Sequence, residues 1–278
     1  MRFFAQNFED LILNRLFEDK SDGFYFDVGA FHPEDLSITN FFYKKGWSGL
    51  NIEPIEKNFK LFLSKRPRDI NINCVISNNP STVDFFLHPK KELSTIIPPS
   101  KGLIDSNKSK KIKVKAIKGK KIVAEHHLFN KVDFLKVDTE GSELDVLESF
   151  DFEKFKPQVI LVEIVQNFKF DVLLYDFINS SKEVKNINPY LKDFDYKDVY
   201  FDGLNNFYVK KDNLEFKKKL SYGPSIYDID LSSLYRQIAT NHKTEIKLNK
   251  KINFLQYHAD ERLKIINKKL IKQIKQDT

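Results

Sequence analysis

Short apolar runs alternate with segments of helical spacing along the first 210 residues of the chain. Runs rich in β-branched and aromatic residues predict buried strands, whereas apolar residues three and four positions apart predict amphipathic helices. Strands are expected near 24–30, 47–54, 70–77, 82–88, 132–138 and 157–165. Helices are expected near 8–18, 37–45, 55–65, 142–150 and 170–180.

This alternation predicts an α/β domain whose mostly parallel sheet is covered by helices on both faces. The segment 198–211 predicts a β-hairpin with Asp202-Gly203 at its turn, which adds an antiparallel edge to the sheet. The stretch 78–130 is less regular. After its strand come a connection rich in Ser, Pro and Lys and a segment dominated by Lys.

After about residue 221 the pattern changes to a turn-rich connector and then to one long amphipathic helix at 243–276 with a basic outer face. We therefore expect a domain of residues 1–220 and a separate C-terminal part of residues 221–278. Such a helix packs on its own domain, pairs with a second copy, binds a membrane surface or an acidic partner, or contacts nucleic acid. Mass measurement on a chain ending near Asp230 tests a homo-oligomer held by this helix, and an unchanged oligomeric state contradicts it.

Charge and cysteine content exclude several classes of protein. The chain has 46 Lys/Arg against 39 Asp/Glu, a formal net charge of +7, but residues 241–278 carry +6 of it. A nearly neutral body argues against a nucleic-acid cleft in the main domain. The single cysteine, Cys74, excludes an intramolecular disulfide and a zinc site built on paired cysteines. No apolar run approaches the roughly 20 residues that span a bilayer, and the N-terminal pattern is not that of a secretory signal, so a cytoplasmic protein is expected.

The first chemical motif is Asp27-Val-Gly29-Ala30, at the end of the first predicted strand. A glycine at such a turn allows close approach of the backbone to a ligand. A dinucleotide site would need further glycines for the pyrophosphate, but Phe, His, Pro and Glu follow instead. A ligand with a cationic head fits better, because Asp27 can pair with an ammonium group.

The second motif is Glu53, which closes the second predicted strand. A carboxylate at this place can accept both hydroxyls of an adenosine ribose. An adenosine, an ammonium group and no pyrophosphate together describe S-adenosylmethionine.

Further acids end the later strands. Asp138 lies at the end of the predicted strand 132–138, and Glu163 lies near the end of the apolar strand 157–165. Ligands of open α/β sheets bind at the carboxyl ends of the strands, and a lone buried carboxylate is costly unless it is paired or binds a metal. Glu140 and Glu143 are also explained as first-turn residues favoured by the helix dipole.

Six blocks of sequence occur in the order known from one enzyme family. FAQNFEDLIL, FYFDVGAFHPEDLSITNFFYKKGWSGLNIEP, ELSTI, VDFLKVDTEGSELDVL, QVILVEI and YFDGLNNFYV resemble the FkbM family of S-adenosylmethionine-dependent methyltransferases, from about residue 4 to about 210. The resemblance implies a class I (Rossmann-like) methyltransferase fold and O-methylation of a sugar or secondary metabolite.

The resemblance also assigns roles to residues. It implies that Asp27, Gly29, Ala30 and Glu53 hold the cofactor, that Ser77 lies near the adenine, and that Asp138 lies beside the sulfonium. Related sugar O-methyltransferases use a divalent metal held by strand-end acids. This suggests Mg²⁺ on Asp138 and Glu163.

A sugar hydroxyl needs a general base or a metal before it attacks the methyl group. The candidate catalytic residues are Asp138, Glu163 and His32, which follows the first strand. Asp202 and Asn205 are candidates for binding substrate hydroxyls.

The expected function is O-methylation of a hydroxyl of a nucleotide sugar, a surface polysaccharide or another glycoconjugate. One alternative is a non-catalytic assembly module with the same fold. A nucleic-acid methyltransferase is disfavoured, because the Asn/Asp-Pro-Pro-aromatic motif is missing after strand four and the acids there would repel a phosphate backbone. A nicotinamide oxidoreductase is disfavoured by the missing glycines.

Overall fold

A computed structural model describes residues 3–89, 93–98, 109–164, 182–224 and 228. The helices predicted for 170–180 and 243–276 lie outside the described residues. The strands and helices described here belong to one compact unit within residues 2–225.

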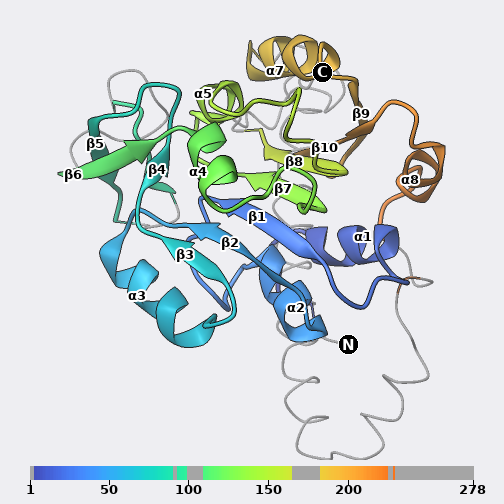
Figure 1. The fold of residues 1–278 in the computed structure, drawn as a ribbon, viewed down its shortest axis with the longest axis horizontal. Helices are drawn as coiled ribbons and strands as arrows, with labels where there is room; N and C mark the ends of the chain where they lie inside the picture. Colours follow the sequence, from blue (N-terminus) through green and yellow to red (C-terminus); the bar gives the residue numbers. More distant parts are fainter. Residues whose placement is uncertain (1–2, 90–92, 99–108, 165–181, 225–227, 229–278) are drawn as a thin grey trace, which may run out of the picture. The chain divides into compact units, whose positions relative to one another are not determined.

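The main element is a seven-stranded sheet with the order β3-β2-β1-β7-β8-β10-β9 (Figure 1). Its strands are β1 (Phe24–Val28), β2 (Ser48–Ile52), β3 (Ile70–Ile72), β7 (Phe134–Val137), β8 (Val159–Glu163), β9 (Tyr196–Phe201) and β10 (Asn205–Lys210). Six of these strands run in the same direction, and β10 runs antiparallel to them. The predicted mostly parallel sheet with an antiparallel hairpin is thus confirmed.

Among the described residues, seven α-helices accompany these strands: α1 (Glu9–Leu16), α2 (Ile38–Lys45), α3 (Glu56–Lys65), α4 (Gly119–Glu125), α5 (Glu143–Glu148), α7 (Lys182–Lys192) and α8 (Leu214–Lys219). Gly46 ends α2 with a φ of 110°, as its place after the predicted helix suggests. Helices α4, α7 and α8 were not predicted from the sequence.

Both faces of the sheet are buried, and successive side chains of a strand point to opposite faces. In β1, the Tyr25 ring lies 5.9 Å from that of Phe134, which in turn packs on Phe42 of α2. The next residue, Phe26, packs instead on Phe150 and belongs to the core shared with α4, α5 and α7. Because both faces are buried, the central strands consist mainly of apolar residues and do not alternate between apolar and polar ones.

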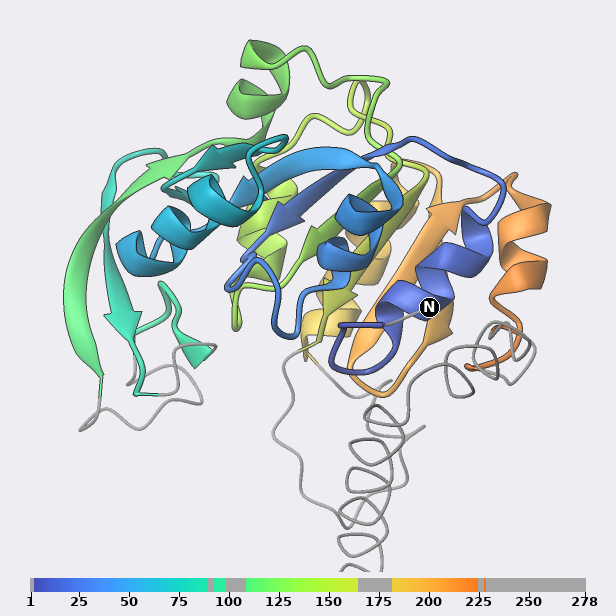
Figure 2. The same ribbon diagram turned by 90° about the horizontal axis from the view of Figure 1, so that it is seen from below.

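A smaller sheet, β4-β6-β5, lies beside the β3 edge of the main sheet (Figure 2). It consists of β4 (Val75–Ile76), β5 (Thr82–Leu87) and β6 (Lys110–Ile117), and its inner face packs on Ile55. The segment 70–77, predicted as one strand, is therefore two. The side chain of Asn73 donates to the carbonyls of Glu53 and Pro54, which fixes the chain where it leaves β3 for β4.

The loop after β1 is held by a buried arginine. Arg66 is 1 % exposed, pairs with Asp69 at 3.4 Å, and donates to the carbonyl of Pro33 and the hydroxyls of Tyr25 and Ser37. These acceptors compensate the cost of burying the guanidinium charge. The bonds of Arg66 also fix the loop that borders the candidate site.

Candidate functional site

A cavity of about 320 Å³ opens at the carboxyl ends of β1, β2, β7 and β8. This volume is at the lower end of the roughly 300–1,000 Å³ typical of small-molecule sites. The strands that follow β1 in the chain lie on one side of it (β2 and β3), and the later strands lie on the other side, beginning with β7. The cavity therefore lies at the topological switch point, where open α/β sheets bind ligands.

Gly29 allows the loops after β1 and β7 to touch. Its φ is +76°, and a Cβ atom built there would lie 1.8 Å from the carbonyl oxygen of Asp138. The loops are also tied by backbone bonds, from Asp138 N–H to the carbonyl of Val28 and from Ala30 N–H to that of Ile52. Only glycine fits this approach, which explains the motif that the sequence analysis identified.

Lys136 lies at the centre of the acidic side of the cavity, although sequence reasoning missed it. Its Nζ donates to the carbonyl of Gly29 at 2.9 Å and lies 3.1 Å from Asp138 Oδ2 and 3.3 Å from Asp27 Oδ1. Burial opposes the charged amine, but the carboxylates of Asp138 and Asp27 outweigh it and raise the pKa of Lys136. The available signal was a lysine within an otherwise apolar strand, since such a charge requires partners.

Asp27 is almost fully buried and already has a cationic partner. Its Oδ2 accepts a 3.0 Å hydrogen bond from Thr39, and its Oδ1 faces Lys136. A ligand ammonium of the kind predicted from the sequence would share Asp27 with Lys136.

Glu53 bridges the loops that follow β1 and β2. One carboxylate oxygen accepts from Ile55 N–H at 2.7 Å and the other from Phe31 N–H at 2.9 Å. Burial raises the pKa of Glu53 to about 8, although these two bonds act in the opposite direction. Each oxygen keeps a second lone pair that can accept a ligand hydroxyl.

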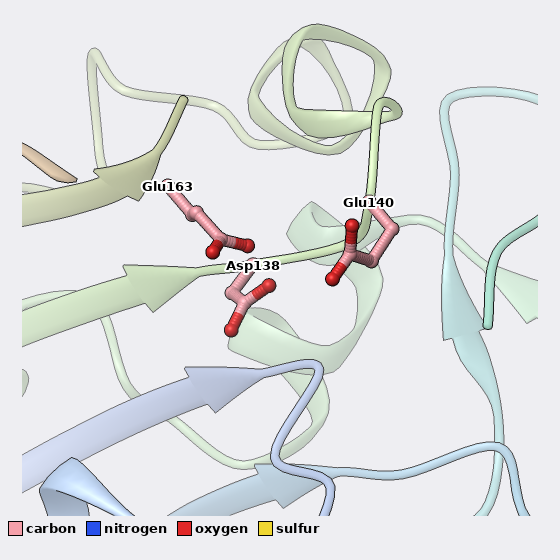
Figure 3. Close-up of side chains that lie close together, drawn as sticks. All are labelled: Asp138, Glu140 and Glu163. Carbon is pink, nitrogen blue, oxygen red and sulfur yellow. The ribbon is translucent and has the colours of Figure 1, made fainter. Parts of the chain in front are cut away.

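Three carboxylates converge at the ends of β7 and β8. Asp138, Glu140 and Glu163 point toward one another (Figure 3), with one oxygen of each within 4.8 Å of the others. Burial and the charge of Asp138 raise the pKa of Glu163, whose Oε2 is buried without a hydrogen-bond partner among the described residues. Burial alone would raise the pKa of Asp138, but Lys136 and a hydrogen bond with Glu163 lower it. The pair can therefore share one proton, or it can ligate a cation together with Glu140.

Glu143 has a structural role. Its carboxylate accepts from the backbone N–H groups of Thr139 and Gly141, so it fixes the turn before α5 that carries Glu140. Glu140 itself has a φ of 55°, an uncommon conformation for a side chain of this size.

Four predicted site residues are not among the described residues that line the cavity: His32, Ser77, Asp202 and Asn205. The Nδ1 atom of His32 accepts from the N–H groups of Glu34 and Asp35, and the Ser77 hydroxyl accepts from Asn79 N–H. The carboxylate of Asp202 accepts from the backbone and side chain of Asn205 in the hairpin turn. Their functional roles remain predictions.

Beside the acids, the cavity has an apolar wall that the sequence did not reveal. Ile55 comes from the loop after β2, Val75 and Phe85 from the small sheet, and Ile96 from the segment 93–98 that packs against it. Burial raises the pKa of Cys74, which also lines the cavity, to about 12. No helix among the described residues is long and apolar enough to cross a membrane.

The solved structures that match the chain include the crystal structure of "Methyltransferase FkbM from Methylobacillus flagellatus KT". The two chains are 15% identical with a TM-score of 0.40, and the alignment covers 68% of this chain and 43% of the other. This chain therefore matches less than half the length of that protein. No curated protein matches the chain. The family described as "Methyltransferase FkbM domain" matches residues 27–197, from β1 to the start of β9. Because this match extends over more than half of the sequence, the chain belongs to the FkbM methyltransferase family.

Proposed function

We propose that the protein is an S-adenosylmethionine-dependent O-methyltransferase that acts on a hydroxyl of a sugar, either a nucleotide sugar or part of a surface polysaccharide or glycoconjugate. One observation carries the proposal. A single cavity has Glu53 at the end of β2 on one side, Asp138 and Glu163 at the ends of β7 and β8 on the other, and the Gly29 turn between them.

The residues present fit the cofactor. The free lone pairs of Glu53 suit the two ribose hydroxyls, and the wall of Ile55, Val75 and Phe85 suits an adenine ring. In this proposal, Asp27 and Lys136 border the amino-acid end of the cofactor, whose ammonium and carboxylate carry the complementary charges.

The acids after β7 and β8 suit the reacting end. Methyl transfer is an in-line displacement, in which the acceptor oxygen bonds to the methyl carbon as the carbon–sulfur bond breaks. The oxygen gains positive charge as this bond forms, so its proton becomes acidic and can pass to a nearby carboxylate. We assign this role to Asp138, which Lys136 keeps ionised.

Asp138, Glu140 and Glu163 would also hold a divalent cation such as Mg²⁺. Three carboxylates form the hard oxygen donor set that this ion prefers, and the buried Oε2 of Glu163 lacks a hydrogen-bond partner among the described residues. A cation at this site would lower the pKa of a substrate hydroxyl bound to it.

Calorimetric titration with S-adenosylhomocysteine tests the cofactor site. The native protein should bind with micromolar affinity, about −8 kcal/mol, and Glu53→Ala should lose most of it. Glu56→Ala is the matched control, because Glu56 is an exposed carboxylate three residues away that pairs with Lys60 on the surface of α3. Titrations with Mg²⁺ and with EDTA then measure the cation requirement. A native protein that binds no S-adenosylhomocysteine would refute the proposal and favour the non-catalytic assembly module.

A further inference from the structure

The segment Phe3–Phe8, here called the N-terminal strap, lies between two loops at the carboxyl edge of the sheet. Ala5 forms a parallel bridge with Leu36 in the loop after β1. The side chain of Asn7 donates to the carbonyl of Asp202 at 2.8 Å, in the turn between β9 and β10. Figure 2 shows this dark-blue segment beside the orange hairpin. The strap begins more than 20 residues before the family match at residue 27.

Two adjacent buried acids hold the strap in place. Asp10 is 0% exposed, and its Oδ2 accepts from the N–H groups of Phe4 and Ala5 at 2.6 and 3.1 Å. Glu9 is 2% exposed and accepts from Asn7 N–H at 2.8 Å and from the Asn205 side chain at 2.9 Å. Burying two carboxylates is unfavourable unless each of them accepts hydrogen bonds. Because the backbone of the strap supplies these bonds, the strap has a defined position.

The backbone conformation of two residues also indicates that the strap has a fixed position. Phe8 at the end of the strap and Leu36 at its bridge have φ angles of 66° and 55°, in the left-handed region that bulky residues avoid. Both side chains are also about half exposed, at 54% and 53%, so burial of these side chains does not explain the strain. Strained positions of this kind persist where surrounding contacts over-determine them, and they concentrate at functional sites.

The consequence of this fixation is the position of Gln6, which lines the cavity. Its two neighbours are the anchored residues Ala5 and Asn7. Its side chain is exposed, and its carboxamide makes no hydrogen bond to another described residue. The strap therefore places Gln6, whose carboxamide can both donate and accept a hydrogen bond, at the cavity.

Gln6 lies on the acidic side of the cavity rather than the apolar one. Asn7 of the strap is bonded to Asp202, and Glu9, directly after the strap, is bonded to Asn205 at the start of β10. Asn205 is paired directly with Glu163 of β8. Glu53 and the small sheet belong to the other edge, beyond β2. In the proposed function, the acidic side is where the acceptor hydroxyl meets the methyl group.

We propose that Gln6 recognises the acceptor by hydrogen bonding to the hydroxyls of a neutral sugar ring, and that Glu9, Asp10, Asp202 and Asn205 are positioning residues for it. This inference rests on the proposed function. A carboxamide both donates and accepts, as adjacent ring hydroxyls do. The three carboxylates nearby disfavour an anionic group at this end. Asp202 and Asn205, predicted to bind substrate directly, would thus act through the strap.

The test uses the full chain saturated with S-adenosylhomocysteine and a panel of neutral methyl glycosides of hexoses and 6-deoxyhexoses. Saturation-transfer NMR identifies those that bind, and titration gives their dissociation constants. Gln6→Ala should weaken glycoside binding by about 3- to 10-fold, the loss of one or two neutral hydrogen bonds, with an unchanged affinity for S-adenosylhomocysteine. Asn130→Ala is the matched control, an exposed carboxamide in the turn before β7, at the opposite end of that strand.

The outcomes separate the two proposals. A Gln6→Ala protein that binds the glycosides as well as the native protein overturns the role of Gln6. A native protein that binds S-adenosylhomocysteine but none of the glycosides overturns neutral-sugar recognition and leaves the cofactor site standing. A native protein that does not bind S-adenosylhomocysteine overturns the proposed function itself.

Discussion

Replacing Lys136 with Met should strongly destabilise the domain. The ammonium group faces Asp27 at 3.3 Å and Asp138 at 3.1 Å and donates to the carbonyl of Gly29. At an effective dielectric constant of about 20, each charge pair at these distances attracts with about 5 kcal/mol. Removing the lysine also removes the unfavourable burial of its own charge. A net loss of about 3–5 kcal/mol is therefore expected, as for other buried pairs that lose one partner.

Chemical denaturation of Lys136→Met and of Lys131→Met measures this loss. Lys131 is an exposed lysine five residues earlier, so its substitution should change the free energy of unfolding by less than about 0.5 kcal/mol. In a domain of this size, a loss of about 3–5 kcal/mol lowers Tm by about 10 °C. The double variant Asp27→Asn/Lys136→Met should be more stable than the sum of the single effects predicts, because it leaves fewer unpaired charges. A loss below about 1 kcal/mol for Lys136→Met would refute the assignment of Lys136 as the central counter-ion.

Three further predictions concern the same cavity. Gly29→Ala should abolish S-adenosylhomocysteine binding and lower Tm, because the new Cβ atom would meet the carbonyl of Asp138; native-like binding in titration would contradict this. Burial raises the pKa of Glu53 from 4.5 to about 8 in the folded protein, so folding favours the protonated carboxyl. The stability that this contributes is present below pH 4.5 and is lost as pH rises through the folded-state pKa of about 8. Glu53→Gln, which loses one hydrogen bond of about 1 kcal/mol, should be less stable than the native protein at pH 5 but lose less stability toward pH 9; parallel curves of Tm against pH would argue against a buried titrating carboxyl. Cys74, buried and with its pKa raised to about 12, should react with a thiol reagent such as DTNB only at the rate of unfolding; rapid labelling of the native protein would exclude the buried position.

Strands with two buried faces were the most predictable elements. β7 and β8 bury every residue or all but one, so apart from Lys136 their sequences are apolar up to Asp138 and Glu163. The break between β3 and β4 was not predictable, because it depends on hydrogen bonds from Asn73 to a distant loop. The strand β6 was missed because four of its eight residues are lysines. Its pairing with β5 places three of them, Lys111, Lys113 and Lys115, on one exposed face.

The chemistry of the site divides in the same way. Asp27, Gly29, Glu53, Asp138 and Glu163 were singled out from the sequence, and all five line the cavity. The end of a strand is a local feature, and the carboxyl ends of parallel strands share one edge of a sheet. Lys136 and Glu140 were not singled out, since their importance lies in the distances to groups on other elements.

By itself, the sequence determined the α/β layering and the row of acids at the strand ends, because both follow from the local order of apolar, glycine and acidic residues. Only the tertiary structure decided which charges face one another. Lys136 has its three partners because β1 and β7 are neighbours in the sheet, and Gln6 reaches the cavity because Glu9 and Asp10 fix a segment against loops 30 and nearly 200 residues away. Pairings across such separations depend on the packed fold, and no local pattern of residues encodes them.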